Sequence, residues 1–363
     1  MKIKSVVCVG TYPKAGRVPI FFIVPHDELN DKKRIIRKDL EVYQAKLIKY
    51  IIGTVGEEQI VGKKRFHGII PPVATIFTKE GKLDAAGMGR MIDYVIAGGV
   101  HGLFFLGSAG EFSNMSESLR KQTAEFCIRH TAGRLPALVG ISALGTDETI
   151  MYGKHAKSIG ADGVVVINPY YALLSEENLY NYFKTIAGEV DLPIFIYHYP
   201  DVTGQAIPVR ILKKLALDCP NIVGVKDTVD TLNHIRDAIL ELKTARPDFL
   251  VIAGFDEYIL STLILGGDGG VPASANFAPQ ITVGIYEAFQ NKDYEQSFAL
   301  QKRLAYVPQE IYPLATPFYA VLKEAARMTG LDISTHVLAP AAPLSPEKKI
   351  LLRASLKKIG ILQ

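Results

Sequence analysis

The sequence predicts an α/β protein, a TIM (β/α)₈ barrel with a C-terminal three-helix extension and an N-terminal appended segment. From about residue 66 onward, eight short apolar runs, many of them rich in β-branched residues, alternate with amphipathic stretches. Near-continuous apolarity is typical of parallel strands that helices cover on both faces. Eight such units over about 225 residues match the size of a TIM barrel. A doubly wound sheet is less favoured, because no GxGxxG motif follows the first run.

Each strand and helix of the barrel is expected from a local pattern. In chain order, the strands are expected in the runs GIIPPVATIF (68–77), HGLFFLG (101–107), PALVGIS (136–142), DGVVVINP (162–169), LPIFIYHY (192–199), NIVGVKD (221–227), FLVIAG (249–254) and DGGVPAS (268–274). The helices between them are expected at residues 84–98, 116–131, 146–160, 175–189, 208–217, 230–244 and 256–266. Ser116, Thr146 and Ser175 stand at three helix starts, where a side-chain oxygen can cap free backbone N–H groups.

The two ends of the chain do not follow the barrel pattern. Beyond residue 280 no further strand signal appears, and helices are expected near 279–305, 309–329 and 346–361. Residues 1–65 combine a Pro-bounded apolar run (Val18–Pro25) with a basic helical stretch (Lys32–Ile52), and we expect them to have no part in the chemistry. The predicted division is therefore an N-terminal extension (1–65), a catalytic barrel (66–280) and a helical region (281–363).

Composition and charge exclude several classes of protein. The chain is 48% hydrophobic and 21% charged, which is typical of a globular protein with a sizeable core. Its net charge of +4 arises at the N-terminal end, because residues 1–65 carry 14 Lys/Arg and 7 Asp/Glu, whereas the rest carries 27 and 30. The barrel thus has no general basic surface for nucleic acid. No apolar run approaches the roughly 18 residues of a membrane span.

The cysteines indicate a reducing compartment. Cys8, Cys127 and Cys219 lie far apart and form no CxxC pair. Reduced thiols in a cytoplasmic protein are the simplest interpretation.

Candidate catalytic residues follow from the barrel itself, because active sites of this fold lie at the C-terminal ends of the strands. Lys226 closes the apolar run IVGVK, and burial there disfavours its ammonium form, leaving a free amine that can attack a carbonyl. Tyr197 ends the preceding strand and can shuttle protons when a hydroxyl group holds it in place. Ser108 lies in a Gly-flanked turn whose backbone N–H groups can bind a carboxylate.

The histidines predict no metal site. The eight histidines show no HxxxH or HExxH spacing, which argues against a catalytic metal centre. His198 directly follows Tyr197, so strand alternation is expected to turn it away from the face that Tyr197 uses.

Several motifs together resemble one enzyme family. The motifs are GSAGE (107–111), PYY (169–171), YHYP (197–200) and GVKDT (224–228). From about residue 66 to 363 the chain resembles the pyruvate-dependent class I aldolases grouped with dihydrodipicolinate synthase and N-acetylneuraminate lyase. The motifs occur in the family's order and span nearly the whole barrel.

The resemblance implies a role for each matching residue. Lys226 matches the lysine that forms a Schiff base with the keto acid, so no cofactor or metal is expected. Tyr197 matches the proton-relay tyrosine, and Ser108 the hydroxyl that links the relay. Tyr171 matches a tyrosine lent by a neighbouring subunit, which implies at least a dimer. Members of the family commonly form a homotetramer built as a dimer of dimers, and the same assembly is expected here. Ala109 replaces a second hydroxyl residue, but its N–H group can still bind the substrate carboxylate.

The resemblance also favours one branch of the family. Dihydrodipicolinate synthases carry an arginine in the loop where this chain has Val202, and loss of a bidentate carboxylate clamp is not conservative. GFDE (254–257) resembles the GYDE of neuraminate lyases, and the motifs together are most similar to 2-keto-3-deoxy sugar-acid aldolases. The implied substrate-binding positions beside Ala109 are Thr228, Gly254, Asp256, Glu257 and Val271, of which Thr228, Asp256 and Glu257 are candidates to read sugar hydroxyls.

The expected activity is reversible cleavage of a 2-keto-3-deoxy sugar acid, of pentonate or gluconate type, to pyruvate and a small hydroxyaldehyde. Two alternatives stay open within the family, namely dihydrodipicolinate synthase and N-acetylneuraminate lyase activity. A third, from a different class, is a non-catalytic barrel that binds keto acids. The sequence leaves the chain length and stereochemistry of the sugar open, since these depend on pocket differences of about 1–3 kcal/mol.

Overall fold

The computed structural model describes residues 66–363 and two short strands near the N-terminus, β1 (Val7–Cys8) and β2 (Phe21–Phe22). The chain divides into two compact units, Met1–Val61 and Gly62–Gln363. Within the first unit, β1 and β2 pair antiparallel.

The N-terminal predictions are only partly covered by these residues. The apolar run Val18–Pro25 contains β2. The basic stretch Lys32–Ile52 lies outside the described residues.

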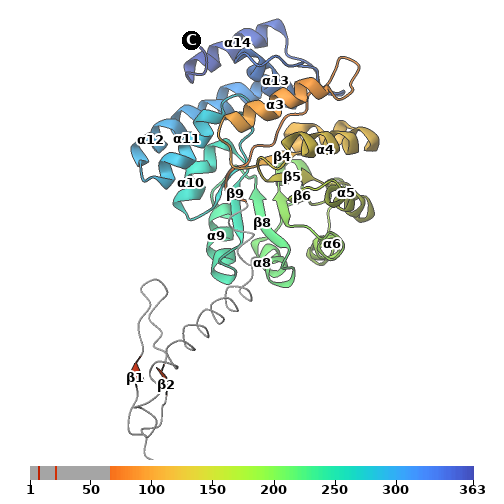
Figure 1. Ribbon diagram of the computed structural model, residues 1–363, viewed down its shortest axis with the longest axis vertical. Coiled ribbons are helices and arrows are strands. Elements are labelled where there is room, and N and C mark those ends of the chain that lie inside the picture. The colour runs from red at the N-terminus through yellow and green to blue at the C-terminus, as the bar shows by residue number, and fades with distance from the viewer. Residues whose placement is uncertain (1–6, 9–20, 23–65) are drawn as a thin grey trace, which may run out of the picture. The chain divides into compact units, whose positions relative to one another are not determined.

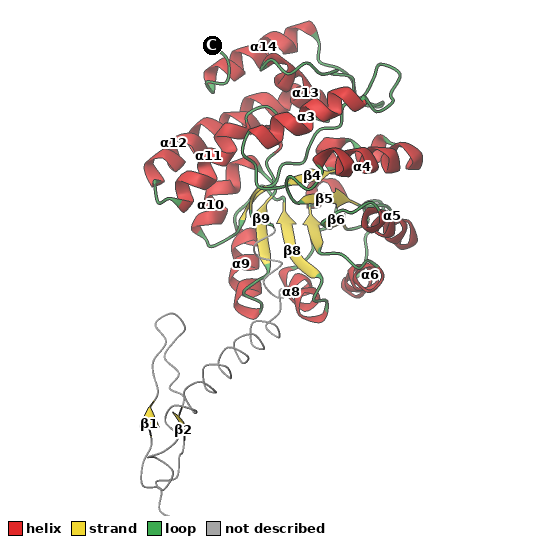
Figure 2. Cartoon of the chain, viewed as in Figure 1, coloured by secondary structure: helices red, strands yellow, loops and turns green. Residues whose placement is uncertain are grey.

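Eight parallel strands form the centre of the second unit (Figure 2). They are β3 (Gly68–Ile69), β4 (Leu103–Phe105), β5 (Ala137–Gly140), β6 (Gly163–Ile167), β7 (Ile194–His198), β8 (Ile222–Asp227), β9 (Leu250–Ala253) and β10 (Gly269–Gly270). All eight lie inside the apolar runs that predicted them. Their order is β3-β10-β9-β8-β7-β6-β5-β4, so each strand from β4 to β9 lies beside its successor in the chain, and β10 lies beside β3.

Backbone hydrogen bonds close this sheet into a barrel. The segment that continues β3 runs parallel to β4, with a bridge between Pro72 and Phe104. Val73 N donates to Phe104 O at 2.8 Å, and Phe104 N donates to Pro71 O at 3.0 Å. The predicted TIM-barrel class is therefore confirmed.

A helix follows every strand and covers the outside of the barrel (Figure 1). The helices are α3 (Ala85–Ala97), α4 (Glu117–Thr131), α5 (Thr146–Ser158), α6 (Glu176–Glu189), α8 (Val209–Asp218), α9 (Asn233–Ala245), α10 (Ile259–Ile264) and α11 (Pro279–Gln290). The short helix α7 (Pro200–Thr203), one turn long, lies between β7 and α8.

Two of the three predicted helix caps are confirmed. Ser116 accepts a hydrogen bond from Leu119 N, and Ser175 accepts one from Asn178 N. Thr146 was wrongly expected as a cap, because the helix begins at this residue and Gly145 occupies the cap position. Its hydroxyl is thus not placed to cap the first turn.

The predicted C-terminal extension consists of α12 (Tyr294–Leu304), α13 (Tyr319–Met328) and α14 (Pro346–Lys358). The single helix expected at 279–305 is divided in two, since the chain turns at Asn291–Asp293 with Lys292 at a φ of 63°. The first half, α11, completes the eighth βα unit. The helix expected at 309–329 is interrupted. A π-helical turn (Val307–Ile311) and a 3-10 turn (Tyr312–Leu314) precede α13, because Pro313 and Pro317 break the pattern.

The apolar core has a layer inside the barrel and layers between strands and helices. The inner layer consists of Phe66, Ile70, Phe104, Leu138, Val165, Ile167, Phe195, Tyr197, Leu250, Ile252 and Val271. Since these side chains fill the interior, a ligand can bind only at the mouth of the barrel. Among the residues that the structure describes, no helix is both long and apolar enough to cross a bilayer.

Candidate active site

Lys226 and Tyr197 lie side by side at the barrel mouth. Each is the penultimate residue of its strand, Lys226 on β8 and Tyr197 on β7, and the two are direct partners in the parallel register. Lys226 Nζ lies 3.9 Å from the centre of the Tyr197 ring and 5.3 Å from that of Phe104. The two side chains that the sequence predicted to act together are therefore in contact.

Burial changes the protonation of Lys226. The side chain is only 4% exposed, and this desolvation lowers its pKa from 10.5 to about 7. The carboxylate of Asp256 acts in the opposite direction but does not cancel the effect of burial. About half of the amine is thus uncharged at neutral pH, which is the form that attacks a carbonyl.

Tyr197 and Ser108 form a hydroxyl pair beside the amine. The two oxygens are 3.5 Å apart, and either can donate. Burial raises the pKa of Tyr197, whereas the contact with Ser108 opposes that shift. The phenol therefore keeps its proton near neutral pH and can lend it to a reacting group. The ring of Tyr199 stacks on Tyr197 at 5.8 Å and widens this aromatic wall.

The loop that carries Ser108 is held in an unusual backbone conformation. Residues Ser108–Gly110 form one 3-10 turn, with Ala109 buried in it. Two non-glycine residues bracket the turn in the left-handed region, Leu106 at a φ of 57° and Glu111 at 60°. Such residues persist only where the surrounding structure over-determines them, and they cluster at functional sites.

An ion pair that sequence reasoning missed anchors this loop. Glu111 and Lys323, on α13, are both fully buried, and Lys323 Nζ donates to Glu111 Oε1 at 2.5 Å. The second carboxylate oxygen accepts from Leu338 N at 2.8 Å, and Lys323 Nζ also donates to His336 O at 2.7 Å. The partners are 212 residues apart, so no local pattern indicated the pair.

Thr228, the first residue after β8, packs against Gly254, the first residue after β9. Thr228 is 3% exposed, and the backbone N–H of Gly254 donates to Asp227 O at 2.7 Å. A Cβ atom at position 254 would lie 1.7 Å from Thr228 Oγ1. Glycine is therefore required at this position for Thr228 to face the barrel mouth.

Asp256 and Glu257 follow β9 but differ in their surroundings. Asp256 is 2% exposed, and its carboxylate accepts hydrogen bonds from Ser274 N at 3.2 Å, from the Ser274 hydroxyl, and from Tyr312 OH at 2.8 Å. Burial raises the pKa of Glu257 to about 7. Its Oε2 is buried without a hydrogen-bond partner in the described part of the chain. Glu257 is thus better placed than Asp256 to meet a hydroxyl group.

The remaining sequence-predicted positions lie in different environments. Val271 is 2% exposed and belongs to the inner layer of the core. Tyr171 is 92% exposed in the single chain and does not enter the site of its own barrel. Val202, at the position of the missing arginine, is 51% exposed on α7.

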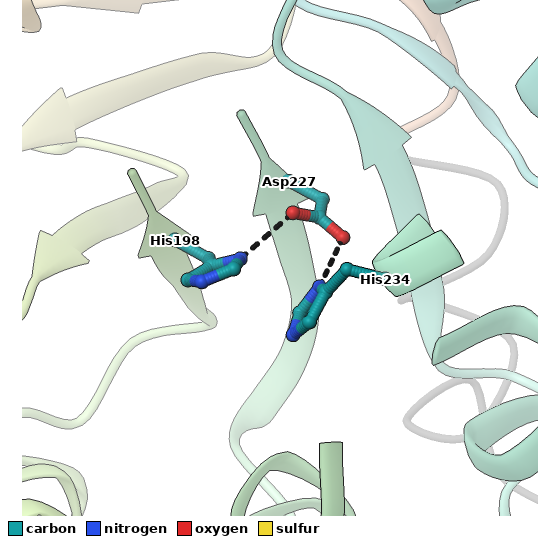
Figure 3. Close-up of side chains that lie close together, drawn as sticks. All are labelled: His198, Asp227 and His234. Carbon is teal, nitrogen blue, oxygen red and sulfur yellow. Dashed lines mark hydrogen bonds and ion pairs between the residues drawn. The ribbon is translucent and has the colours of Figure 1, made fainter. Parts of the chain in front are cut away.

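A third group of polar side chains lies directly behind Lys226 and Tyr197. His198, Asp227 and His234 come from β7, β8 and α9, and both histidines face the one carboxylate (Figure 3). His198 Nδ1 lies 2.8 Å from Asp227 Oδ1, and His234 Nδ1 lies 2.6 Å from Asp227 Oδ2. His198 was expected to face away from Tyr197, and its contacts agree. The cluster itself was missed, because spacing motifs find ligands on one helix and these residues come from three elements.

Comparison with known sequences matches the chain to one family. The profile described as the dihydrodipicolinate synthetase family matches residues 65–359. The protein YagE of Escherichia coli K12, provisionally named a 2-dehydro-3-deoxy-D-gluconate aldolase, is 46% identical over 82% of this chain and 98% of its own. YjhH of the same organism, provisionally named a 2-dehydro-3-deoxy-D-pentonate aldolase, is 43% identical over 82% of this chain and 99% of its own.

Solved structures agree with the sequence comparison. The crystal structure of YagE from E. coli K12 in complex with pyruvate has a TM-score of 0.81 and 45% identity, covering 82% of this chain and 99% of that one. The dihydrodipicolinate synthase of Thermotoga maritima has a TM-score of 0.78 and 30% identity, with the same coverage.

Proposed function

The chain belongs to the dihydrodipicolinate synthetase family, and we propose that it is a Schiff-base (class I) aldolase acting on a 2-keto-3-deoxy sugar acid. In this reaction a pentonate- or gluconate-type acid is cleaved reversibly to pyruvate and a small hydroxyaldehyde. The observation that carries the proposal is the buried amine of Lys226, with its pKa lowered to about 7, lying against Tyr197 at the barrel mouth.

The first step joins the substrate to the protein. The uncharged amine of Lys226 attacks the C2 ketone to give a carbinolamine, and the phenol of Tyr197 protonates the departing hydroxyl. Water leaves, and an iminium ion and the Tyr197 phenolate remain. The backbone N–H groups of the turn Ser108–Gly110 hold the substrate carboxylate, which orients the ketone toward the amine. No dissociable cofactor takes part, because the iminium ion itself accepts the electron pair of the broken bond.

Cleavage then depends on proton transfer through Tyr197. The C4 hydroxyl gives its proton to the Tyr197 phenolate as the C3–C4 bond breaks. The aldehyde leaves, and the electron pair of the broken bond converts the iminium ion to an enamine. Tyr197 and Ser108 pass a proton back to C3, after which water hydrolyses the iminium ion and releases pyruvate. General acid–base assistance of this kind contributes about 10²–10⁴-fold to the rate.

The polar groups beyond the reacting carbons favour a hydroxylated substrate. Glu257 has a buried carboxyl oxygen and Thr228 a buried hydroxyl. Neither oxygen has a hydrogen-bond partner among the described residues, so both can bind a substrate hydroxyl. Val202 provides no cation for a second carboxylate, unlike the arginine expected of a dihydrodipicolinate synthase. The provisional names of YagE and YjhH favour the same substrate class.

Exposure of Tyr171 favours a shared site. A tyrosine that is 92% exposed has no packing role in its own chain. We infer that it completes the site of a neighbouring subunit within a homotetramer.

Borohydride trapping tests the covalent step. Incubation with pyruvate and borohydride, followed by peptide mass mapping, is expected to yield one reduced adduct, on Lys226. The yield should rise with pH through about 7, since only the uncharged amine reacts. The variant Lys226→Met should give no adduct, and the absence of an adduct on folded wild-type protein contradicts the proposal.

A substrate panel tests the branch of the family. Keto-deoxy pentonate, gluconate, galactonate and neuraminate are compared with aspartate semialdehyde plus pyruvate. Cleavage of the pentonate or gluconate is expected, whereas reaction with aspartate semialdehyde alone would show that the branch is wrong. The variant Tyr171→Phe should lower turnover; wild-type turnover in it contradicts the shared site.

A further inference from the structure

The side chains His198, Asp227 and His234, here named the outer network, form a closed hydrogen-bond system on the outside of the barrel wall. His198 and Asp227 are at most 1% exposed, and His234 is 17% exposed. Figure 3 shows the carboxylate of Asp227 between the two imidazoles, with one oxygen turned to each. Neither Lys226 nor Tyr197 belongs to this network, and the mechanism above does not use it.

The acceptors around His234 determine its charge. Its Nδ1 faces a carboxylate oxygen, and its Nε2 lies 2.9 Å from the carbonyl oxygen of Ile207. Both partners can only accept, so both ring nitrogens must carry protons and the ring is an imidazolium ion. Burial opposes this charge, but the contacts with Asp227 raise the pKa of His234 above its usual value.

His198 has the opposite state. Its Nδ1 donates to Asp227, whereas its Nε2 is buried and has no hydrogen-bond partner among the described residues. Burial lowers the pKa of His198, so the ring is neutral and Nε2 carries a lone pair. The other carboxylates that act on the two rings are Asp201 on α7 and Asp237 on α9.

The same three side chains could be taken for a metal site, since two histidines and an aspartate are a common ligand set. The atoms that face one another, the Nδ1 atoms of both histidines and the two oxygens of Asp227, are instead engaged in hydrogen bonds of 2.6–2.8 Å. An ion would have to displace both protons from the middle of the network. The geometry therefore favours a proton-filled network over a metal centre.

The outer network and the reacting pair, Lys226 and Tyr197, lie on opposite faces of the same two strands. In the register of β7 and β8, Tyr197 is the partner of Lys226 and His198 is the partner of Asp227. Successive side chains of a strand point to opposite faces, so a bond between one pair constrains the other. The bond to His234 extends the constraint to α9. Each strand end is thus held on the face away from the substrate.

We propose that the outer network is a positioning device that fixes the reacting pair in contact, an inference that rests on the proposed aldolase function. Its imidazolium–carboxylate–imidazole arrangement holds the ends of β7 and β8 together where the backbone ladder stops. The amine and the phenol then meet the substrate without a rearrangement of the strand ends. None of the three side chains touches the substrate.

Imidazole ¹⁵N NMR of the wild-type protein tests the assigned charges. His234 is expected to carry protons on both nitrogens at pH 7, and His198 on Nδ1 alone. Chemical shifts of a neutral His234 overturn the proposal. Stoichiometric binding of Zn²⁺ that is lost in the variant Asp227→Asn also overturns it.

Kinetics of Asp227→Asn test the positioning role. The change keeps the shape of the side chain but removes the charge, and kcat is expected to fall about 10- to 100-fold, a size typical of lost orienting contacts. KM is expected to change little, because the loop proposed to hold the carboxylate is untouched. His155→Gln is the matched control, since His155 pairs with Glu125 at 3.0 Å on the outer helices. It should retain wild-type kcat.

A further variant and a further measurement keep the test decisive. If Asp227→Asn does not fold, His198→Gln removes the link to β7 while the Asp227–His234 pair remains, and the same loss of kcat is expected. Wild-type kcat in the folded variant overturns the proposal. Labelling of Lys226 by a general amine reagent separates this result from failure of the aldolase function. The labelling pH profile should move toward that of an ordinary lysine in the variant, and an unchanged profile overturns the positioning role even if no substrate is found.

Discussion

Replacing Lys226 by methionine should make the protein more stable while abolishing the proposed activity. The folded protein holds the pKa of this lysine at about 7, against 10.5 in the unfolded chain. Each tenfold difference in this equilibrium corresponds to about 1.4 kcal/mol, so the buried amine costs the fold roughly 4 kcal/mol at pH 7. Methionine keeps the length and flexibility of the chain and removes the charge. The roughly 4 kcal/mol is an upper bound, because the ammonium also gains from the Tyr197 ring.

The pKa shift also determines how the free energy of unfolding changes with pH. Between pH 7 and 10.5 the unfolded chain binds the lysine proton and the folded protein does not, so wild-type stability rises with pH in this window. The gain in free energy of unfolding from Lys226→Met is therefore largest below pH 7 and disappears as the pH approaches 10.5. Urea unfolding followed by circular dichroism, at about pH 6 and about pH 9, measures both values.

A lysine on the surface serves as the control. Lys213, on α8, pairs with Glu241 at 3.6 Å and is 41% exposed. Lys213→Met should change the free energy of unfolding by less than about 0.5 kcal/mol. If Lys226→Met is no more stable than wild type at pH 6, the reasoning from burial is refuted.

Two further predictions concern contacts that hold the site. Glu111→Gln and Lys323→Met should each lower the free energy of unfolding by about 3–5 kcal/mol, because each leaves a buried charge unpaired, and the double variant should recover part of the loss. A double-mutant cycle by urea unfolding measures this coupling, and strictly additive losses would contradict it. Gly254→Ala should cost about 1–3 kcal/mol, since its Cβ would meet Thr228 Oγ1 at 1.7 Å. Thr228→Ala should partly restore the thermal midpoint of that variant, and wild-type stability of Gly254→Ala alone would disprove the clash.

Local patterns were enough to predict the barrel. Parallel strands covered on both faces must be apolar along their whole length, and this property is visible in each run without knowledge of its neighbours. The same logic predicted that Lys226 and Tyr197 face the barrel mouth and that His198 faces the other way, because alternation is a property of one strand. The helix predicted at 279–305 was too long, because periodicity did not reveal the turn at Lys292.

Long-range pairing was beyond such patterns. Glu111 meets Lys323 only because the loop after β4 and helix α13 pack together, and neither residue is unusual in its own segment. The same holds for Asp256, whose partners Ser274 and Tyr312 come from separate parts of the chain. For these residues the sequence indicated a polar side chain but not its partner.

What the sequence determined by itself was the fold class and the lysine and tyrosine at the strand ends, since strand periodicity and burial are local properties of the chain. Only the tertiary structure decided how protons and charges are distributed among the buried groups. The size of the pKa shift of Lys226, the imidazolium state of His234 and the ion pair of Lys323 all depend on which groups exclude water and which face each other. Those distances arise only when distant segments pack.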